Sequence, residues 1–414
     1  MIGIIHFTNC YLADNSQLVK KDLYIDTKQG IIIDGSSIEK ENNECKEGNQ
    51  SEAKVEVIDL DGNLISPGFI DIQINGCFGL DYSTTFEDSQ SKANFVLHYT
   101  ESMEKLLNHG VTSVCPTVTS SFPNVYNDVM MIIGLKTRSS TKTDSLGVHL
   151  EGPFISPLKK GCHPPETLTT MENGYQSLID IYGEEFEKYT AILTAAPEIG
   201  NCLEVIPEIT KNNKIAFSIG HTMSDFETGL QSIKNGASMI THLYNAMPSL
   251  NARNPGVIGL TNTTQDILPS EKIPYYGLVS DGIHVHPTNI KSSYFANPGK
   301  TILVTDAMYL IGLEDGIYKR GNQEIEKNGN LLHLKDTKTI AGSATHLIDC
   351  VNNLIKWTGI SIEKALATVT NNPAMSLNIS KRKGFLKTGC DADLVILTPQ
   401  GEIKQVYKLG NRIV

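Results

Sequence analysis

The stretch IAFSIGHTMSDFETGLQSIKNGASMITHLYN, residues 215–245, has the pattern of one strand–helix–strand unit. The apolar runs at its ends, IAFSIGH (215–221) and SMITHLYN (238–245), are predicted strands. Between them, SDFETGLQSIKNG (224–236) is the clearest predicted helix of the chain. Strands that alternate with helices are typical of folds built on a parallel sheet.

The predicted helix carries start and stop signals of its own. Ser224 and Glu227 have the spacing of a capping box, in which side chains satisfy backbone amides at the helix start. Gly236 suits the left-handed conformation that ends many helices. We therefore expect the helix to be capped by Ser224 and to stop at Gly236.

Eight β/α repeats can be read along the middle of the chain, because eight apolar runs are separated mostly by helical stretches. The predicted strands are GFIDIQI (68–74), VTSVCPTV (111–118), LGVHLEG (146–152), AILTAAPE (191–198), IAFSIGH (215–221), SMITHLYN (238–245), YGLVSDG (276–282) and TILVTDA (301–307). Such repeats predict an α/β fold, a (β/α)8 TIM-like barrel. A doubly wound open sheet is the alternative, but no G-x-G-x-x-G motif follows the first strand.

Both ends of the chain differ from this middle. Residues 1–66 and 372–414 contain short alternating strands and turns, which predict one small β-sandwich domain built from both termini. Residues 67–371 then form the catalytic barrel. The polar segment 39–54 lacks apolar periodicity and is predicted to be an exposed loop of the small domain.

Composition limits the classes of function. The 414 residues carry a net charge of −11, which disfavours a nucleic-acid surface. No apolar run approaches the roughly 18 residues of a membrane span, and the first residues lack the pattern of a signal peptide. Eight cysteines without a C-x-x-C pair are expected to be reduced thiols. We expect a cytoplasmic protein without nucleic-acid or membrane partners.

Polar residues stand where the predicted barrel strands end, which is the active face of such barrels. Glu151, His221 and His242 offer one carboxylate and two imidazoles, a donor set that divalent metals such as zinc favour. Asp306, after the last strand, can exchange a proton with a water or a leaving nitrogen. Together these groups predict metal-assisted hydrolysis of an amide.

Each of these residues has a plainer interpretation. A histidine at a strand end is often only hydrogen-bonded, and Asp306 alone could cap the next helix. Two loops add further candidates with the same ambiguity. His163 could donate to a substrate carbonyl or lie exposed, and Arg253 could bind a phosphate or form a surface ion pair. The segment IAGSA (340–344) could let the backbone approach a ligand or lead into a helix.

Several motifs follow one another along the chain: PGFIDIQINGCFG, HLEGPFISPLKKGCHPPE, TAAPE, GHT, THLYNAM, RNPG, SDGIHV, LVTDAM and GCDADLVIL. Together they resemble the motifs of the N-acetylglucosamine-6-phosphate deacetylases, a family of the amidohydrolase superfamily. The resemblance implies metal ligation by Glu151, His221 and His242, with Asp306 as catalytic base and acid and His163 beside the oxyanion. It implies release of acetate from N-acetylglucosamine 6-phosphate to leave glucosamine 6-phosphate, a step of amino-sugar catabolism.

The resemblance also implies a substrate site and an assembly. Contacts to the phosphorylated amino sugar would come from Cys162, Asn245, Ala246, Arg253, Asp281, Gly282, Ile283, His284, Ile340, Ala341 and Gly342. The expected assembly is a homodimer, in which a neighbouring subunit can contribute to the phosphate pocket.

Gln73 and Asn75 stand where two-metal relatives have His-x-His. An amide ligates zinc poorly, so we expect one divalent metal per subunit, with zinc preferred over iron, cobalt or manganese. The two amides are expected to support the metal ligands without binding the metal themselves, or to order water. Two rival functions remain open. The chain could hydrolyse another acylated substrate, such as an N-acyl amino acid, or it could be a non-catalytic scaffold on the same barrel.

Overall fold

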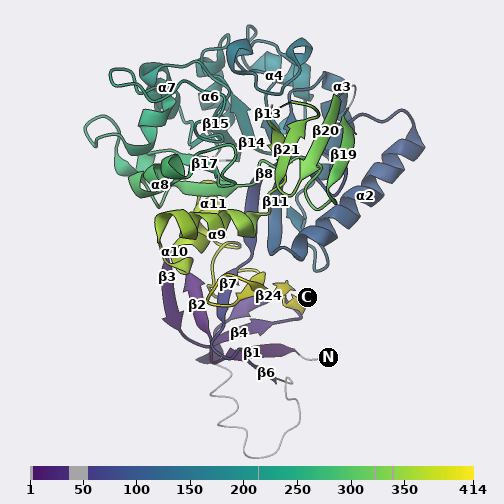
Figure 1. Ribbon diagram of the computed structural model, residues 1–414, viewed down its shortest axis with the longest axis vertical. Coiled ribbons are helices and arrows are strands. Elements are labelled where there is room, and N and C mark those ends of the chain that lie inside the picture. Colours follow the sequence, from purple (N-terminus) through teal and green to yellow (C-terminus); the bar gives the residue numbers. More distant parts are fainter. Residues whose placement is uncertain (1–2, 37–54, 213, 321–322, 338–339) are drawn as a thin grey trace, which may run out of the picture.

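The computed structural model describes residues 3–36, 55–212, 214–320, 323–337 and 340–414. The predicted loop at 39–54 lies outside these residues. Parallel strands form a barrel in the middle of the chain, with neighbours in sequence order (Figure 1). They are β8 (Phe69–Ile74), β11 (Val111–Thr119), β13 (Val148–Glu151), β14 (Thr190–Ala195), β15 (Ala216–Ile219), β16 (Met239–Ile240), β17 (Tyr275–Val279) and β18 (Thr301–Val304). The short β12 (Asp144–Ser145) pairs with the outer part of β11.

The barrel closes between its first and last strands. A parallel bridge joins Ile74 to Ala307, and the backbone N–H of Asp306 donates to the carbonyl of Gln73 at 2.9 Å. The (β/α)8 barrel is therefore confirmed, and the open sheet is wrong. Predicted strand lengths were less accurate. The run 238–245 keeps only Met239–Ile240 as strand, because His242 and Tyr244 adopt positive φ angles of 28° and 79°.

Helices connect the barrel strands and cover its outside (Figure 1). They are α2 (Ser89–Leu107), α3 (Pro123–Ile133), α4 (Tyr175–Tyr182), α5 (Phe186–Tyr189), α6 (Cys202–Thr210), α7 (Phe226–Lys234), α8 (Pro287–Ala296), α9 (Leu347–Thr358), α10 (Ile362–Leu366) and α11 (Asn371–Ser376). None of these described helices combines the length and apolar character needed to cross a membrane.

The predicted capping box on α7 is wrong. Asp225 caps the helix instead, and its carboxylate accepts from the backbone N–H of Thr228 at 2.9 Å. The hydroxyl of Ser224 is occupied elsewhere, since it donates to Glu198 at 2.7 Å. The stop at Gly236 is confirmed, because this glycine follows the helix with a φ of 119°.

Two sheets at one end of the molecule combine both terminal segments (Figure 1). One contains β5 (Ile31–Ile33), β4 (Leu23–Asp26), β1 (Ile4–Thr8) and β6 (Val55–Asp59). The other contains β25 (Asn411–Arg412), β24 (Ile403–Lys408), β23 (Leu394–Leu397), β7 (Leu64–Pro67), β2 (Tyr11–Asp14) and β3 (Gln17–Lys20). The antiparallel pair β7–β23 ties the two segments together. The exact domain boundaries stay a prediction.

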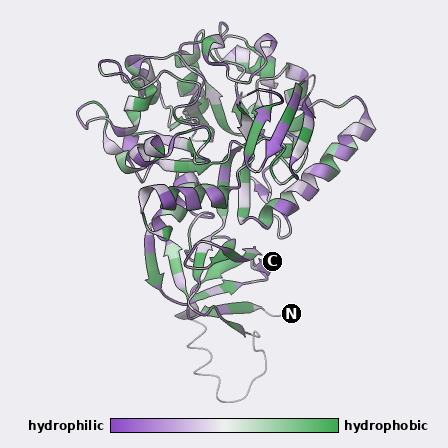
Figure 2. Ribbon diagram, viewed as in Figure 1, coloured by the Kyte–Doolittle hydropathy of each residue, from purple (hydrophilic) through white to green (hydrophobic). Residues whose placement is uncertain are grey.

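Apolar side chains of the two terminal sheets pack in one core with apolar side chains at the base of the barrel. Figure 2 shows the hydrophobic residues concentrated in the strands of both parts. One core cluster includes Phe7 and Ile396 from the terminal sheets and also Ile70, Ile192 and Val304 from barrel strands. Burial of this shared surface holds the terminal sheets against the end of the barrel opposite its mouth.

Charged groups are also buried at this junction. Lys383 and Lys408 contact the carboxylates of Asp144, Asp391 and Asp393 at 2.7–3.0 Å, and all five side chains are nearly inaccessible. We call these five residues the buried ion cluster. Since Asp144 belongs to β12 and Lys408 to β24, the cluster joins the barrel to the C-terminal segment.

A further antiparallel sheet was not predicted. It lies between β18 and α9 in the chain and contains β19 (Gly316–Arg320), β20 (Gln323–Asn328), β21 (Leu331–Leu334) and β22 (Ile340–Ser343). Ser343 bridges to Ala307, just after β18, and thereby fixes the sheet beside the barrel mouth. The segment 340–344, left open as a close approach or a helix entry, begins as the last strand of this sheet.

Candidate active site

A cavity of about 380 Å³ opens at the carboxyl ends of the barrel strands. Its wall contains many of the residues predicted from the sequence together with several that were not. The lining residues are Asn75, Ser83, Thr119, Ser120, Ser121, Glu151, Gly161, Cys162, His163, Pro164, His221, His242, Asn245, Ala246, His284, Asp306, Met308, Ile340 and Gly342. The cavity therefore combines titratable and hydroxyl side chains at the mouth of the barrel.

Three of these groups converge on one point. Glu151 Oε1 lies 3.3 Å from His221 Nε2 and 3.0 Å from His242 Nε2, and the two Nε2 atoms are 3.0 Å apart. Two ligands at about 2.0–2.1 Å from a tetrahedral zinc are separated by roughly 3.3 Å. The three atoms thus have the mutual spacing of ligands around one divalent cation.

Neighbouring groups orient these three side chains. The Nδ1 of His221 is 2.8 Å from the carbonyl of Lys159, so Nδ1–H donates there and the lone pair of Nε2 faces the other two. Gln73 Nε2 donates to Glu151 Oε1 at 3.0 Å. The donor set, its spacing and the hydrogen bond behind His221 all fit a metal site.

The same three residues interact strongly through their charges. Burial alone would raise the pKa of Glu151, but His221 and His242, which donate to it when they are doubly protonated, outweigh burial and hold the pKa well below its usual range. Burial alone would lower the pKa of His242, but the Glu151 carboxylate outweighs it and raises the pKa to about 9. A cation would take the place of the protons that these groups otherwise share.

Asp306 stands beside this set, just past β18, where its φ is 46°. Its Oδ1 accepts from Asn75 Nδ2 at 2.8 Å and from Gln73 Nε2 at 3.3 Å. Burial raises the pKa of Asp306, and the negative charge of Glu151 raises it further. The two amides that end β8 therefore fix the orientation of a carboxylate whose affinity for a proton is increased.

His163 enters the cavity from the loop after β13. Its Nδ1 accepts from the backbone N–H of Ser120 at 3.2 Å and lies 2.7 Å from the Ser120 hydroxyl. Because a backbone N–H can only donate, Nδ1 must be the acceptor, and the proton of the neutral ring is then on Nε2. The ring is held as a hydrogen-bond donor.

His284 lines the cavity at another side, supported by Asp281. The Nδ1 of His284 donates to Asp281 Oδ2 at 2.6 Å. Burial disfavours charge on both groups, yet their mutual attraction outweighs it, so the pKa of Asp281 is lowered and that of His284 is raised. Asp281, Gly282 and Ile283 do not line the cavity, and their contact with substrate stays a prediction. Asp281 holds His284 in place at the cavity wall.

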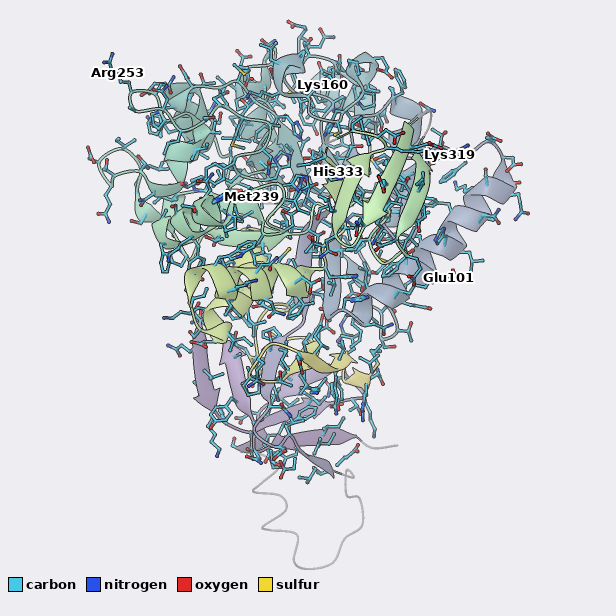
Figure 3. The ribbon with its side chains drawn as sticks, viewed as in Figure 1. Glu101, Lys160, Met239, Arg253, Lys319 and His333 are labelled. Carbon is cyan, nitrogen blue, oxygen red and sulfur yellow. The ribbon has the colours of Figure 1, made fainter. Side chains whose placement is uncertain are left out.

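The structure does not bring Arg253 to the site. This side chain is exposed, does not line the cavity, and lies at the outer edge of the molecule (Figure 3). Ile340 and Gly342 do line it. The side chain of Ala341 lies outside the part of the chain that is described. Asn75 Oδ1 and Asn245 Nδ2 are buried at the cavity without a hydrogen-bond partner among the described residues, so a ligand can satisfy them.

Sequence reasoning missed the hydroxyl groups of the site. Ser83, Thr119, Ser120 and Ser121 line the cavity, and the last three follow directly along the end of β11. The run Thr-Val-Thr-Ser-Ser at 117–121 could have identified them, because the end of the second strand must also face the barrel mouth.

Comparisons with known proteins agree with this arrangement. The model of a family described as "Amidohydrolase family" matches residues 64–413. The N-acetylglucosamine-6-phosphate deacetylase of Bos taurus is 37% identical over 411 residues, which cover 99% of this chain and 95% of that protein. The enzyme of the same name from Bacillus subtilis (strain 168) is 33% identical and covers 84% of each chain. The crystal structure of the Pasteurella multocida N-acetylglucosamine-6-phosphate deacetylase has a TM-score of 0.80 at 24% identity, covers 99% of both chains, and supports the fold.

Proposed function

The chain belongs to the amidohydrolase family, and from that premise we propose that it hydrolyses the acetamide of N-acetylglucosamine 6-phosphate to glucosamine 6-phosphate and acetate. The observation that carries the proposal is the convergence of Glu151, His221 and His242 beside Asp306, with separations of 3.0–3.3 Å among the three ligand atoms. A non-catalytic scaffold would have no need to keep both a ligand set and a buried carboxylate next to it.

Amidohydrolases are metal-dependent, and we infer that one divalent metal is held here by Glu151, His221 and His242. When bound, the metal supplies Lewis acidity, which lowers the pKa of water and polarises a carbonyl oxygen. Zinc is our first choice, with iron, cobalt and manganese as alternatives, because one carboxylate and two imidazoles suit all four. Gln73 and Asn75 donate to Glu151 and Asp306, so their amides support the site and do not add a second set of ligands.

The chain's own residues then account for the proton transfers. Asp306 removes a proton from the attacking water as its oxygen bonds to the acetyl carbon. The Nε2–H of His163 donates to the oxygen of that carbonyl as negative charge develops on it. Asp306 returns the proton to the nitrogen as the C–N bond breaks, so Asp306 is again a carboxylate. Acetic acid and the amine leave, and transfer of the acid's proton to the amine gives acetate and the ammonium form of the sugar.

The phosphate end of the substrate would face His284, whose positive charge is favoured by Asp281. We propose that Arg253 supplements this pocket in a homodimer. Its exposure at the edge of one chain leaves it available to the active site of a neighbouring copy. Seven described cysteines are free thiols, which supports a reducing, cytoplasmic location.

Acetate release from purified protein tests the proposal. N-acetylglucosamine 6-phosphate and its unphosphorylated twin are compared, each with and without chelator. We expect rapid release only from the phosphorylated sugar and only in the presence of metal. Equal rates with both sugars would reject the phosphate pocket. Turnover of N-acyl amino acids in place of the sugar would favour the rival hydrolase.

A further inference from the structure

A second cavity, of about 260 Å³, lies at the opposite end of the barrel from the catalytic mouth. Leu146, Ala191, Ala216, Ser238 and Tyr275 line it, and these residues stand where β13, β14, β15, β16 and β17 begin. The segment from Met375 to Ile379, just before the C-terminal strands, forms another wall. Since the active site lies where the same strands end, the two cavities are separated by the length of the barrel interior.

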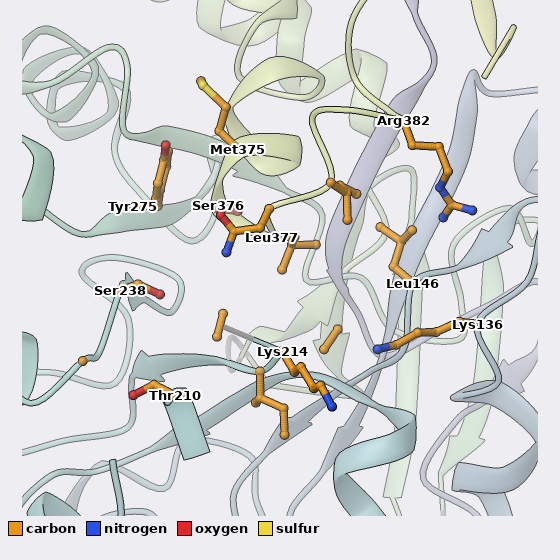
Figure 4. A pocket seen from close by; sticks show the side chains of 16 residues that line it. Lys136, Leu146, Thr210, Lys214, Ser238, Tyr275, Met375, Ser376, Leu377 and Arg382 are labelled. Carbon is orange, nitrogen blue, oxygen red and sulfur yellow. The ribbon is translucent and has the colours of Figure 1, made fainter. Parts of the chain in front are cut away.

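Three cationic side chains line this cavity, and no aspartate or glutamate does. They are Lys136, Lys214 and Arg382. In Figure 4 the ammonium groups of Lys136 and Lys214 lie near each other in the lower part of the view, and Arg382 lies above them at the upper right. A concentration of positive charge at one point is unexpected in a chain whose net charge is −11.

These charges are poorly compensated within the protein. Among the described residues, neither Lys136 nor Lys214 forms an ion pair. The nearest carboxylate to Arg382 is Asp391, at 4.0 Å. Asp391 is already paired with Arg138 at 2.9 Å and with Lys383 at 3.0 Å, so most of the Arg382 guanidinium remains available. An anion in the cavity would have three charge-assisted partners.

The positions of the two lysines in the chain do not explain their convergence. Lys136 lies after the end of α3 at Ile133, and Lys214 lies after the end of α6 at Thr210. Neither lysine belongs to the last turn of its helix, so the helix dipole does not account for them. Arg382 comes from a distant part of the sequence and lines the same cavity.

The remaining walls favour a ligand that is more than a bare ion. Leu146 is buried, and Ile215, Leu377 and Ile379 add apolar surface, while Thr210 and Ser238 supply hydroxyl groups. The volume of about 260 Å³ is slightly below the roughly 300–1,000 Å³ typical of small-molecule sites. The small cavity thus has cationic side chains on one part of its wall and apolar side chains on another, which we call the apolar floor.

We propose that this cavity binds a phosphate monoester of a small metabolite, of about the size of a sugar phosphate. The dianionic phosphate would lie between Lys136, Lys214 and Arg382, and the organic part would rest against the apolar floor. A ligand there would link the starts of the barrel strands to the segment at 375–382. The site is independent of the deacetylase proposal, because no residue lines both cavities.

Hydrogen–deuterium exchange of the full chain with glucose 6-phosphate tests this site, because the probe has the phosphate but no acetamide to hydrolyse. We expect slower exchange of the amides at 375–382, in addition to any effect at the catalytic mouth. In Lys136→Met/Lys214→Met this protection should require at least about tenfold more ligand. Lys214→Glu, a change at an exposed position that folding tolerates, should remove it.

Two controls separate specific binding from general charge effects. Lys92→Met/Lys319→Met removes the same charge from exposed positions outside the cavity and should leave the protection unchanged. Unphosphorylated N-acetylglucosamine should give no protection at 375–382. The proposal would be overturned if the unmodified protein showed no protection at 375–382. It would also be overturned if the cavity variants retained turnover and were protected as strongly as the unmodified protein, or if the control variant lost as much protection as the cavity variants.

Discussion

Replacement of Asp306 by asparagine isolates proton transfer from the rest of the site. The asparagine side chain has nearly the same shape, and its Oδ1 can keep both hydrogen bonds that Asp306 accepts, from Asn75 at 2.8 Å and from Gln73 at 3.3 Å. The three metal ligands are untouched. Since burial raises the pKa of Asp306, its charged form is disfavoured in the folded state, and a neutral amide should not lower stability.

The expected loss is therefore confined to the chemistry. General acid–base catalysis contributes about 10²–10⁴-fold per enzyme, and Asp306 serves in both proton transfers, so kcat of Asp306→Asn should fall by about 10³–10⁴-fold. This corresponds to about 4–5.5 kcal/mol of activation free energy. The assay is acetate release at saturating substrate, with metal content per chain measured in the same preparation.

Asp71→Asn provides a matched control within the same barrel. Asp71 is also buried, and its carboxylate accepts from the Thr305 hydroxyl at 2.6 Å, but it does not line the cavity. Burial raises its pKa to about 7, so a neutral amide resembles the group already present for much of the time. We expect turnover within about tenfold of the unmodified protein. If Asp306→Asn keeps full metal content and near-normal turnover, Asp306 has no part in proton transfer.

Three further predictions address the metal, the phosphate pocket and stability. Dialysis against a chelator should abolish turnover and lower the midpoint of thermal unfolding, because the ion binds only the folded chain. One equivalent of zinc per chain should restore both. An unchanged unfolding midpoint and an unchanged rate would contradict a metal centre. The pKa of His284 is raised, and its charge is lost as pH rises through the folded-state pKa, so KM for the phosphorylated sugar should increase with rising pH. In Asp281→Asn the increase should move to lower pH, and an identical KM profile would remove the pair from substrate binding. Asp393→Asn should lower the free energy of unfolding by about 3–5 kcal/mol in urea titrations, since it leaves lysines of the buried ion cluster uncompensated. The pKa of Asp393 is lowered in the folded state, so this stability is present above the unfolded pKa of about 3.9 and is lost as pH falls toward the lower folded value. Lys404→Met, at an exposed pair with Glu402, should cost less than about 1 kcal/mol, and equal losses at both sites would refute the argument.

Local patterns along the chain were enough to predict the barrel. Runs such as 301–307 are apolar and short because a parallel strand is buried on both faces, and that requirement is visible in one segment at a time. Polar residues just past those runs, such as His221 and Asp306, marked the barrel mouth for the same reason. The chain order of the strands then followed from the rule that successive β/α units are neighbours.

Contacts between distant segments decided the rest. Ser224 has the spacing of a helix cap, but Glu198, from the preceding strand–helix unit, takes its hydroxyl, and nothing within 224–236 reveals this. Arg253 follows a motif of the site yet points away from it, because the direction of a loop depends on the surface that it crosses. The cationic cavity brings together Lys136, Lys214 and Arg382 only because the starts of β13–β17 meet the segment 375–382 in the folded chain. Sequence periodicity records which face of an element is buried, whereas the identity of the group packed against that face exists only in three dimensions.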